Sequence, residues 1–160
     1  MESVRVASIE DVPSIVTMVR AGSEEGIFHY NPSHSFSVEE QRESFRNFAF
    51  EKRPKGYQVL VFETEDTVIG YVDSEVKRGV GHILGIYVDQ KHRRKGIGKQ
   101  LIEYMLQDCM RQGCHKARLE VFANSHKAIG FYKHLGFIQE GYLRNDQENK
   151  DTVIMSKFLQ

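Results

Sequence analysis

The spacing of apolar and polar residues predicts helices and strands that alternate along the whole chain. Apolar side chains three or four residues apart are typical of an amphipathic helix, and this spacing is clearest after Gly96. Ser37 is a typical N-capping residue, and Gly113 and Gly136 are typical helix ends. Four helices are expected, over residues 12–21, 38–52, 97–110 and 124–135.

Stretches rich in β-branched residues, bounded by turn residues, predict seven strands. They cover residues 3–7, 57–63, 68–76, 82–88, 116–122, 137–143 and 152–157. The element order is therefore β-α-α-β-β-β-α-β-α-β-β. This order predicts an α+β (mixed α/β) domain with helices packed on a sheet, and the pattern alone leaves the sheet topology open.

Composition limits the class of protein. A chain of 160 residues is expected to form a single domain, residues 1–160. Because 22 basic residues balance 22 acidic ones, a general nucleic-acid binder is not expected. We expect no membrane partner, since no apolar run approaches the roughly 20 residues that span a bilayer. Two cysteines without a metal-binding pattern predict no metal site and a reducing, cytoplasmic location.

A basic, glycine-bearing loop follows the strand at 82–88 and leads into the helix from Ile97. Its glycines, Gly96 and Gly98, let the backbone approach a ligand closely. The helix start adds unpaired N–H groups and a positive dipole end. Charge-assisted hydrogen bonds can come from the cations that flank the glycines, which are Arg93, Arg94, Lys95 and Lys99.

This junction predicts a site for phosphate, and pyrophosphate is the form of phosphate that we expect there. Two alternatives stay open on the residues alone, a basic nucleic-acid patch and a solvated charged surface. The loop is neither a P-loop nor a dinucleotide-binding fingerprint, because it lacks the Gly-x-x-x-x-Gly-Lys pattern and the Gly-x-Gly-x-x-Gly pattern.

Two motifs together resemble the Gcn5-related N-acetyltransferases (GNAT family). The first is Arg93-x-x-Gly96-x-Gly98 after a strand. The second comprises Leu119-Glu120-Val121, Asn124, Ala128, Phe131-Tyr132 and Leu135-Gly136-Phe137. The resemblance implies a bent mixed sheet with helices on both faces. It also implies acetyl-coenzyme A as co-substrate, with the pantetheine arm held where two strands splay apart.

The resemblance also assigns cofactor contacts. The backbone of Ile86, Tyr87 and Val88 is expected to pair with pantetheine, and one of these N–H groups to polarise the acetyl carbonyl. The pyrophosphate is expected on the loop and the first helical turn, namely Arg93, Arg94, Lys95, Gly96, Ile97, Gly98 and Lys99. Asn124 is expected to contact pantetheine, although capping a helix is an alternative role.

Tyr132 is the expected general acid for the departing thiolate, because a phenol is protonated at neutral pH. Packing as an aromatic residue is its alternative role. The general base is open, since Ile83 stands where many relatives carry Glu. Glu120 is our candidate, with an ion pair as its alternative role. His82, Tyr87 and an ordered water chain are the other options.

The acceptor site is expected near Phe28, His29 and Tyr30, where a mixed aromatic and His surface could receive an amine. The loop at 144–151 could form the opposite wall. The predicted activity is direct acetyl transfer to a primary amine of a small molecule or a protein N-terminus. The alternative is a non-catalytic coenzyme A-binding regulatory module. The sequence leaves the oligomeric state open, a homodimer included.

Overall fold

The computed structural model describes residues 2–28 and 36–160, and a seven-stranded sheet forms its centre. The strand order is β1-β2-β3-β4-β5-β7-β6, and every neighbouring pair is antiparallel except β4 with β5, which is parallel. The strands are β1 (Glu2–Val6), β2 (Tyr57–Thr64), β3 (Thr67–Lys77), β4 (Val80–Val88), β5 (Lys116–Phe122), β6 (Ile138–Leu143) and β7 (Thr152–Phe158).

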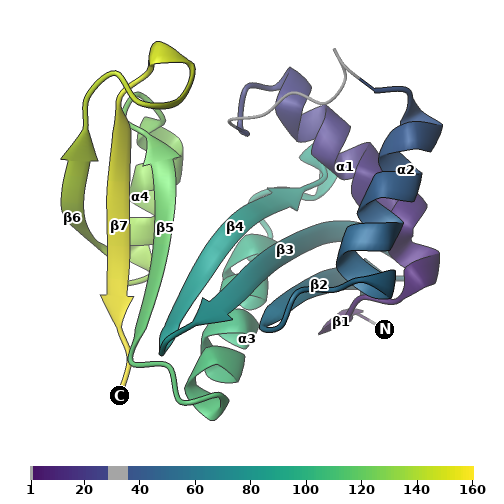
Figure 1. Ribbon diagram of the computed structural model, residues 1–160, viewed down its shortest axis with the longest axis horizontal. Helices are drawn as coiled ribbons and strands as arrows, with labels where there is room; N and C mark the ends of the chain where they lie inside the picture. The colour runs from purple at the N-terminus through teal and green to yellow at the C-terminus, as the bar shows by residue number, and fades with distance from the viewer. Residues whose placement is uncertain (1, 29–35) are drawn as a thin grey trace.

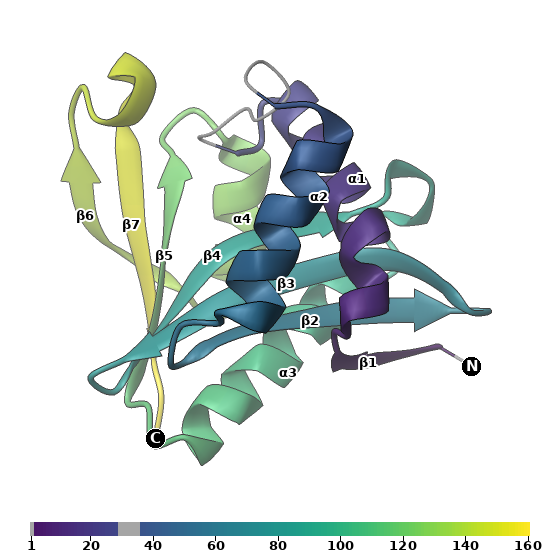
Figure 2. The ribbon, with the colours of Figure 1, turned by 45° about the vertical axis from the view of Figure 1, so that its right-hand side comes forward.

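Within the described residues, four α-helices cover the two faces of this sheet. They are α1 (Val12–Glu24), α2 (Val38–Arg46), α3 (Ile97–Arg111) and α4 (His126–His134). In Figures 1 and 2, α1 and α2 lie on one face of β2–β4, and α3 lies on the opposite face. Side chains of α4 join those of α3 in one apolar cluster. The predicted fold class and element order are confirmed.

Among the residues that the structure describes, two apolar clusters, one on each face, form the core. Leu101 and Met105 of α3 are almost completely buried in the larger cluster. Ile15 of α1 is equally buried in the smaller one. Successive strand residues point to opposite faces, so β2 contributes Leu60 to the first cluster and Val61 to the second. The sheet is therefore buried on both sides where the helices cover it.

Helix ends differ from the sequence expectation in three places. The first helix continues through Gly22 to Glu24. The predicted helix at 38–52 divides into α2 and a π-helical turn at Asn47–Glu51. The fourth helix begins at His126 with Ser125 as its N-cap. The capping role considered for Asn124 is therefore wrong, because that residue precedes the cap position.

The strands β4 and β5 pair over only three positions, and His82 with Arg118 is the last of them. Beyond that pair the two strands diverge, as Figure 1 shows, and β5 continues along β7. In the part of the chain that the structure describes, no strand pairs with the β5-facing edge of residues 83–88. A length of strand backbone is thus left open for another partner.

A bulge in β4 turns the side chains next to this open edge. The register with β3 shifts between Asp73 and Ser74, so that Asp73 lies opposite Gly85 and Ser74 opposite Ile83. The extra residue is Leu84, and a bulge of this kind re-aims the residues that follow it. Ile83, just before the bulge, points into the larger apolar cluster and is 7% exposed. Gly85 faces the α1 side.

Candidate active site

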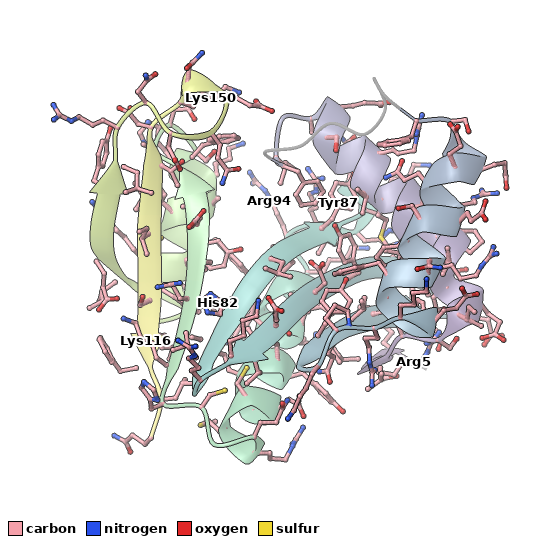
Figure 3. The ribbon with its side chains drawn as sticks, viewed as in Figure 1. Arg5, His82, Tyr87, Arg94, Lys116 and Lys150 are labelled. Atoms are coloured by element: carbon pink, nitrogen blue, oxygen red, sulfur yellow. The ribbon has the colours of Figure 1, made fainter. Side chains whose placement is uncertain are left out.

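The loop between β4 and α3 has the backbone conformation of an anion-binding site. Gly96, the N-cap of α3, adopts a left-handed conformation with φ of 79°. Arg94 is also left-handed, with φ of 63°, which costs a residue with a side chain more than it costs glycine. In Figure 3, Arg94 lies where β4 and β5 are far apart. The free N–H groups of the first α3 turn follow directly.

Gly98 allows α3 to pack closely on its neighbours. A Cβ at this position would lie 3.3 Å from the Phe131 ring of α4 and 3.9 Å from the side chain of Ile86. The glycine therefore serves packing in this structure, and it also keeps the first turn of α3 free of a bulky side chain. Lys99 is half-exposed and lies 3.8 Å from Glu103 one turn later, so its ammonium is weakly held.

Arg93 is bound to the end of α1. Its guanidinium donates to both carboxylate oxygens of Glu25, at 2.8 and 2.9 Å, and its Nε donates to the carbonyl of Val88 at 2.9 Å. Gln90 donates to the same carboxylate at 2.7 Å, and Arg93 lies over the Tyr87 ring at 5.1 Å. We call Glu25, Arg93, Gln90 and Tyr87 the Glu25 clamp. Three of the five N–H donors of Arg93 are thus occupied by the protein itself.

The Glu25 clamp also changes the expected role of the Tyr87 side chain. Burial and the hydrogen bond to Glu25 raise the pKa of Tyr87 to about 12. A phenol with this pKa stays protonated near neutral pH, so the hydroxyl of Tyr87 does not suit a general base. Its backbone, at the end of β4, remains beside the open edge (Figure 3).

Tyr132 lies in the larger apolar cluster, which also holds Leu101 and Met105 of α3, and it is 6% exposed. Its ring meets Phe131 at 5.1 Å and Phe137 at 5.6 Å, both in edge-to-face arrangements. Burial raises the pKa of Tyr132 above its usual value, so the hydroxyl keeps its proton. This geometry satisfies the packing role and is compatible with the acid role, because both need a neutral phenol.

The structure separates the sequence candidates for the base. Glu120 is exposed on β5, opposite Ile154, so the low-dielectric setting that would favour a base is absent there. His82 lies near the point where β4 and β5 meet (Figure 3), 3.4 Å from the Arg118 guanidinium. Burial and the positive charge of Arg118 lower the pKa of His82. Ile83, which cannot take a proton, points into the apolar cluster on the α3 face of the sheet.

A carboxylate that sequence reasoning missed lies beside the bulge. Asp73 of β3 is partly exposed and accepts a hydrogen bond of 3.0 Å from the hydroxyl of Tyr57. Although part of it reaches solvent, burial raises the pKa of Asp73 to about 6. Two signals could have found it: an aspartate within an apolar strand, and an isolated glycine, Gly85, within the next strand.

The predicted acceptor residues are only partly described. Phe28 lies against Tyr71, with 6.4 Å between ring centroids, and its ring contacts the position where a Cβ of Gly85 would stand. His29 and Tyr30 lie outside the described residues. The loop at 144–151 is tied to β6 and to itself by Asp151, which accepts from the hydroxyl of Tyr142 and from the N–H of Asn145. Asn124 is exposed at the end of β5.

The open edge of β4 offers backbone groups that can pair with amides, and the start of α3 beside it offers N–H groups and a positive dipole end that favour an anion. The sequence profile described as "Acetyltransferase (GNAT) family" matches residues 25–137. The chain therefore belongs to this family. It is an N-acetyltransferase.

Relatives within the family have different named activities. The [ribosomal protein bS18]-alanine N-acetyltransferase of Salmonella typhimurium is 27% identical over 111 residues, which cover 67% of this chain and 75% of that protein. An N-alpha-acetyltransferase of Sulfurisphaera tokodaii is 27% identical over 131 residues, which cover 71% of this chain and 78% of that protein. The spermidine N-acetyltransferase of Vibrio cholerae, solved with CoA and spermine, has a TM-score of 0.83 at 20% identity, covering 98% and 95%.

Two further properties concern the described residues only. None of their helices combines the length and apolar character that crossing a membrane requires. They contain no group of three or more His, Cys, Asp or Glu side chains placed to hold a metal ion.

Proposed function

We propose that this protein transfers the acetyl group of acetyl-coenzyme A directly to a primary amine, in a complex that holds both substrates. The observation that carries the proposal is the open edge of β4 beside the first turn of α3. Backbone N–H and C=O groups along residues 83–88 offer pantetheine amides the pairing of an added strand. The first turn of α3 offers phosphate oxygens N–H groups and a positive dipole end.

The individual contacts follow from this arrangement. Ile86, Tyr87 and Val88 pair with the pantetheine through their backbones, and one of their N–H groups polarises the thioester carbonyl. The pyrophosphate takes the backbone N–H groups from Arg94 to Lys99, with side-chain charge from Arg94, Lys95 and Lys99. Arg93 supports this loop through the Glu25 clamp rather than through a full set of free donors. Asn124 contacts the pantetheine from the β5 side.

Tyr132 is the proposed general acid. The departing thiolate needs a proton, and a phenol whose pKa is raised by burial is in the protonated form that can supply it. Tyr132 comes from α4, and Phe131 before it packs on Gly98, so the helix that carries the phenol lies against the proposed phosphate loop.

The acceptor is a primary amine of a small molecule or of a protein N-terminus. The names of the relatives span both classes, since they include an alanine N-acetyltransferase for a ribosomal protein and a spermidine N-acetyltransferase. The aromatic side chain of Phe28 beside β4 supports an acceptor bound on the α1 side of the sheet. We expect the enzyme to act in the cytoplasm.

The test is thiol release from acetyl-coenzyme A with a panel of amino acids, polyamines, aminoglycosides and N-terminal peptides. Release that depends on one amine class supports the proposal and names the substrate. A reaction without amine is the control. Binding of acetyl-coenzyme A without release on any amine favours the non-catalytic regulatory module instead. A protein that binds duplex DNA in a salt-dependent way, and not acetyl-coenzyme A, refutes both.

A further inference from the structure

Asp73 stands out among the described side chains because it is an acidic group set between three tyrosines and a phenylalanine. It belongs to β3, at the position opposite Gly85, directly after the β4 bulge. Its own face of the sheet carries Tyr57 of β2, Tyr71 of β3 and Tyr87 of β4, all of which are buried. An ionised carboxylate in such surroundings is costly unless something compensates for it.

The two carboxylate oxygens have different surroundings. Oδ2 accepts from the hydroxyl of Tyr57 at 3.0 Å. Oδ1 lies at Gly85, 3.1 Å from where a Cβ would stand, and the Tyr71 hydroxyl and the Phe28 ring lie 3.5 and 3.4 Å from the same point. One oxygen is thus fixed by a phenol, while the other lies over a residue that has no side chain. The backbone N–H groups of Gly85 and of Asp73 itself also favour the ionised carboxylate. We call Asp73, Tyr57, Tyr71, Phe28 and Gly85 the Asp73 cluster.

The Asp73 cluster adjoins the position where acetyl transfer is proposed. Gly85 immediately precedes Ile86, the first of the residues whose backbone is proposed to hold the pantetheine. Asp73 is partly exposed as a residue and lies on the face of the sheet that also carries Phe28. A nitrogen hydrogen-bonded to Oδ1 would therefore lie beside the residue that begins the pantetheine edge.

Charge distinguishes Asp73 from the other candidates. The side chains that act on its carboxylate from neighbouring elements are the phenols of Tyr57 and Tyr71, and the Tyr87 phenol beyond them is already paired with Glu25. His82, by contrast, lies 3.4 Å from the Arg118 guanidinium, which would repel an ammonium group. Glu120 is exposed on β5, where water competes for a cation. Among the described acids, Asp73 is the one in low-dielectric surroundings beside the proposed transfer point.

We propose that Asp73 binds the ammonium group of the acceptor and takes its proton, with Tyr57 holding the carboxylate in place and Gly85 allowing the carboxylate to lie close to the backbone of β4. This inference rests on the proposed function and adds a catalytic residue to it. The predicted ligand is a primary alkylammonium group whose carbon chain is apolar, because the aromatic side chains of Phe28 and Tyr71 flank the carboxylate.

The proton and electron count of the step is complete without a further reactant. One N–H proton passes to Asp73, and the nitrogen lone pair forms the C–N bond at the thioester carbon. The C–S bond breaks, and its electron pair leaves on sulfur, which takes a proton from the Tyr132 phenol. The nitrogen loses its second proton as the amide forms, and this proton restores the Tyr132 phenol. Asp73 releases the first proton to solvent. The products are the amide, the thiol of coenzyme A and one proton.

The first experiment compares Asp73→Asn with wild type in the amine-dependent thiol-release assay from about pH 5 to about pH 9, a range that brackets the raised carboxyl pKa. We expect wild-type kcat/KM to rise through about pH 6, where Asp73 ionises. We expect Asp73→Asn to lose about 100-fold or more in kcat. Its pH–rate profile should also lose the rise near pH 6 (the acidic limb), while its affinity for acetyl-coenzyme A is kept. Asp66→Asn, at an exposed turn position, is the matched control and should behave as wild type.

Tyr57→Phe is the second variant, and it tests the role of the phenol without removing the carboxylate. Because the Tyr57 hydrogen bond favours the ionised carboxylate, its loss should move the acidic limb to higher pH while leaving a measurable rate. Asp73→Asn that keeps its rate within about threefold and keeps the limb would overturn the proposal, since general-base catalysis is expected to contribute far more.

A third measurement does not depend on turnover. Carbon-13 NMR follows the Asp73 carboxyl during a pH titration with and without butylammonium chloride, and sodium chloride at equal ionic strength is the control. Binding of the cation should lower the pKa of the Asp73 carboxyl. If the pKa of the Asp73 carboxyl is the same with and without butylammonium, Asp73 is not the ammonium site. A wild type that releases no thiol with any amine but shows this shift would refute the proposed function and leave the ammonium site standing.

Discussion

Replacement of Glu25 by Gln tests whether the Glu25 clamp holds the phosphate loop to α1. The side chain nearly keeps its shape and loses its charge, so the ion pair with Arg93 is replaced by a hydrogen bond from the charged guanidinium to an uncharged amide oxygen. Hydrogen bonds from Arg93 lower the pKa of Glu25 from 4.5 to about 2. At about 1.4 kcal/mol per pKa unit, that shift corresponds to an upper limit of about 3 kcal/mol of folding stability.

Solvent reduces this limit. The Arg93 side chain is 36% exposed and that of Glu25 is 22% exposed, so water screens part of the interaction. We therefore expect Glu25→Gln to lower the free energy of unfolding by about 1–2 kcal/mol near neutral pH. Because the folded-state pKa is depressed, this contribution is complete above about pH 4.5 and is lost as the pH falls toward 2.

Urea unfolding followed by circular dichroism measures the effect at about pH 7 and about pH 3.5. The difference between Glu25→Gln and wild type should be smaller at the lower pH, which lies inside the titration window. Glu24→Gln, the exposed neighbouring residue, is the control. A difference below about 0.3 kcal/mol near neutral pH, or an equal difference at both pH values, would refute the reasoning.

Three further predictions address single positions. Gly96→Ala should cost about 1 kcal/mol of stability and weaken acetyl-coenzyme A binding in calorimetry, because an alanine is strained at φ of 79°; an unchanged affinity would show that the loop tolerates another conformation. Tyr132→Phe should reduce kcat with the acetyl-coenzyme A dissociation constant unchanged, and equal turnover at all pH values would remove Tyr132 from the acid role. Asp73→Asn should raise the free energy of unfolding near neutral pH by about 1–2 kcal/mol, since the carboxyl pKa is raised from 3.8 to about 6 and ionisation therefore opposes folding above about pH 4; a loss of stability on urea unfolding would contradict this.

Local periodicity was sufficient to predict most of the elements. The α3 stripe that includes Leu101 and Met105 is strongly amphipathic, and both residues are buried as the pattern predicts. Strand boundaries agree to within two residues for the same reason, since β-branched runs end at turn residues. The helix expected over residues 38–52 is less accurate, because it changes to a π-helical turn at Asn47–Glu51. Phe48 in this turn packs on Tyr57 of β2, a contact that local periodicity does not reveal.

The site was predictable only where it depends on the chain's local conformation. The helix start after Gly96 could be found from spacing, because the loop, the cap and the helix are neighbours in sequence. The separation of β4 from β5 could not, because the pairing that ends at His82 joins segments about 36 positions apart. Glu25 lies 68 positions from Arg93. Long-range pairs of this kind are set by how the sheet and helices pack.

The short pairing between β4 and β5 also determines what holds the two parts of the sheet together. Three residue pairs join the strands at one end. Beyond them, the larger apolar cluster takes side chains from both parts, with Val72 of β3 and Leu119 of β5 among them. Tyr132 belongs to the same cluster. The position of the proposed acid relative to β4 therefore depends on side-chain packing and not on backbone pairing, so substitutions within this cluster can alter the site without touching a residue that contacts substrate.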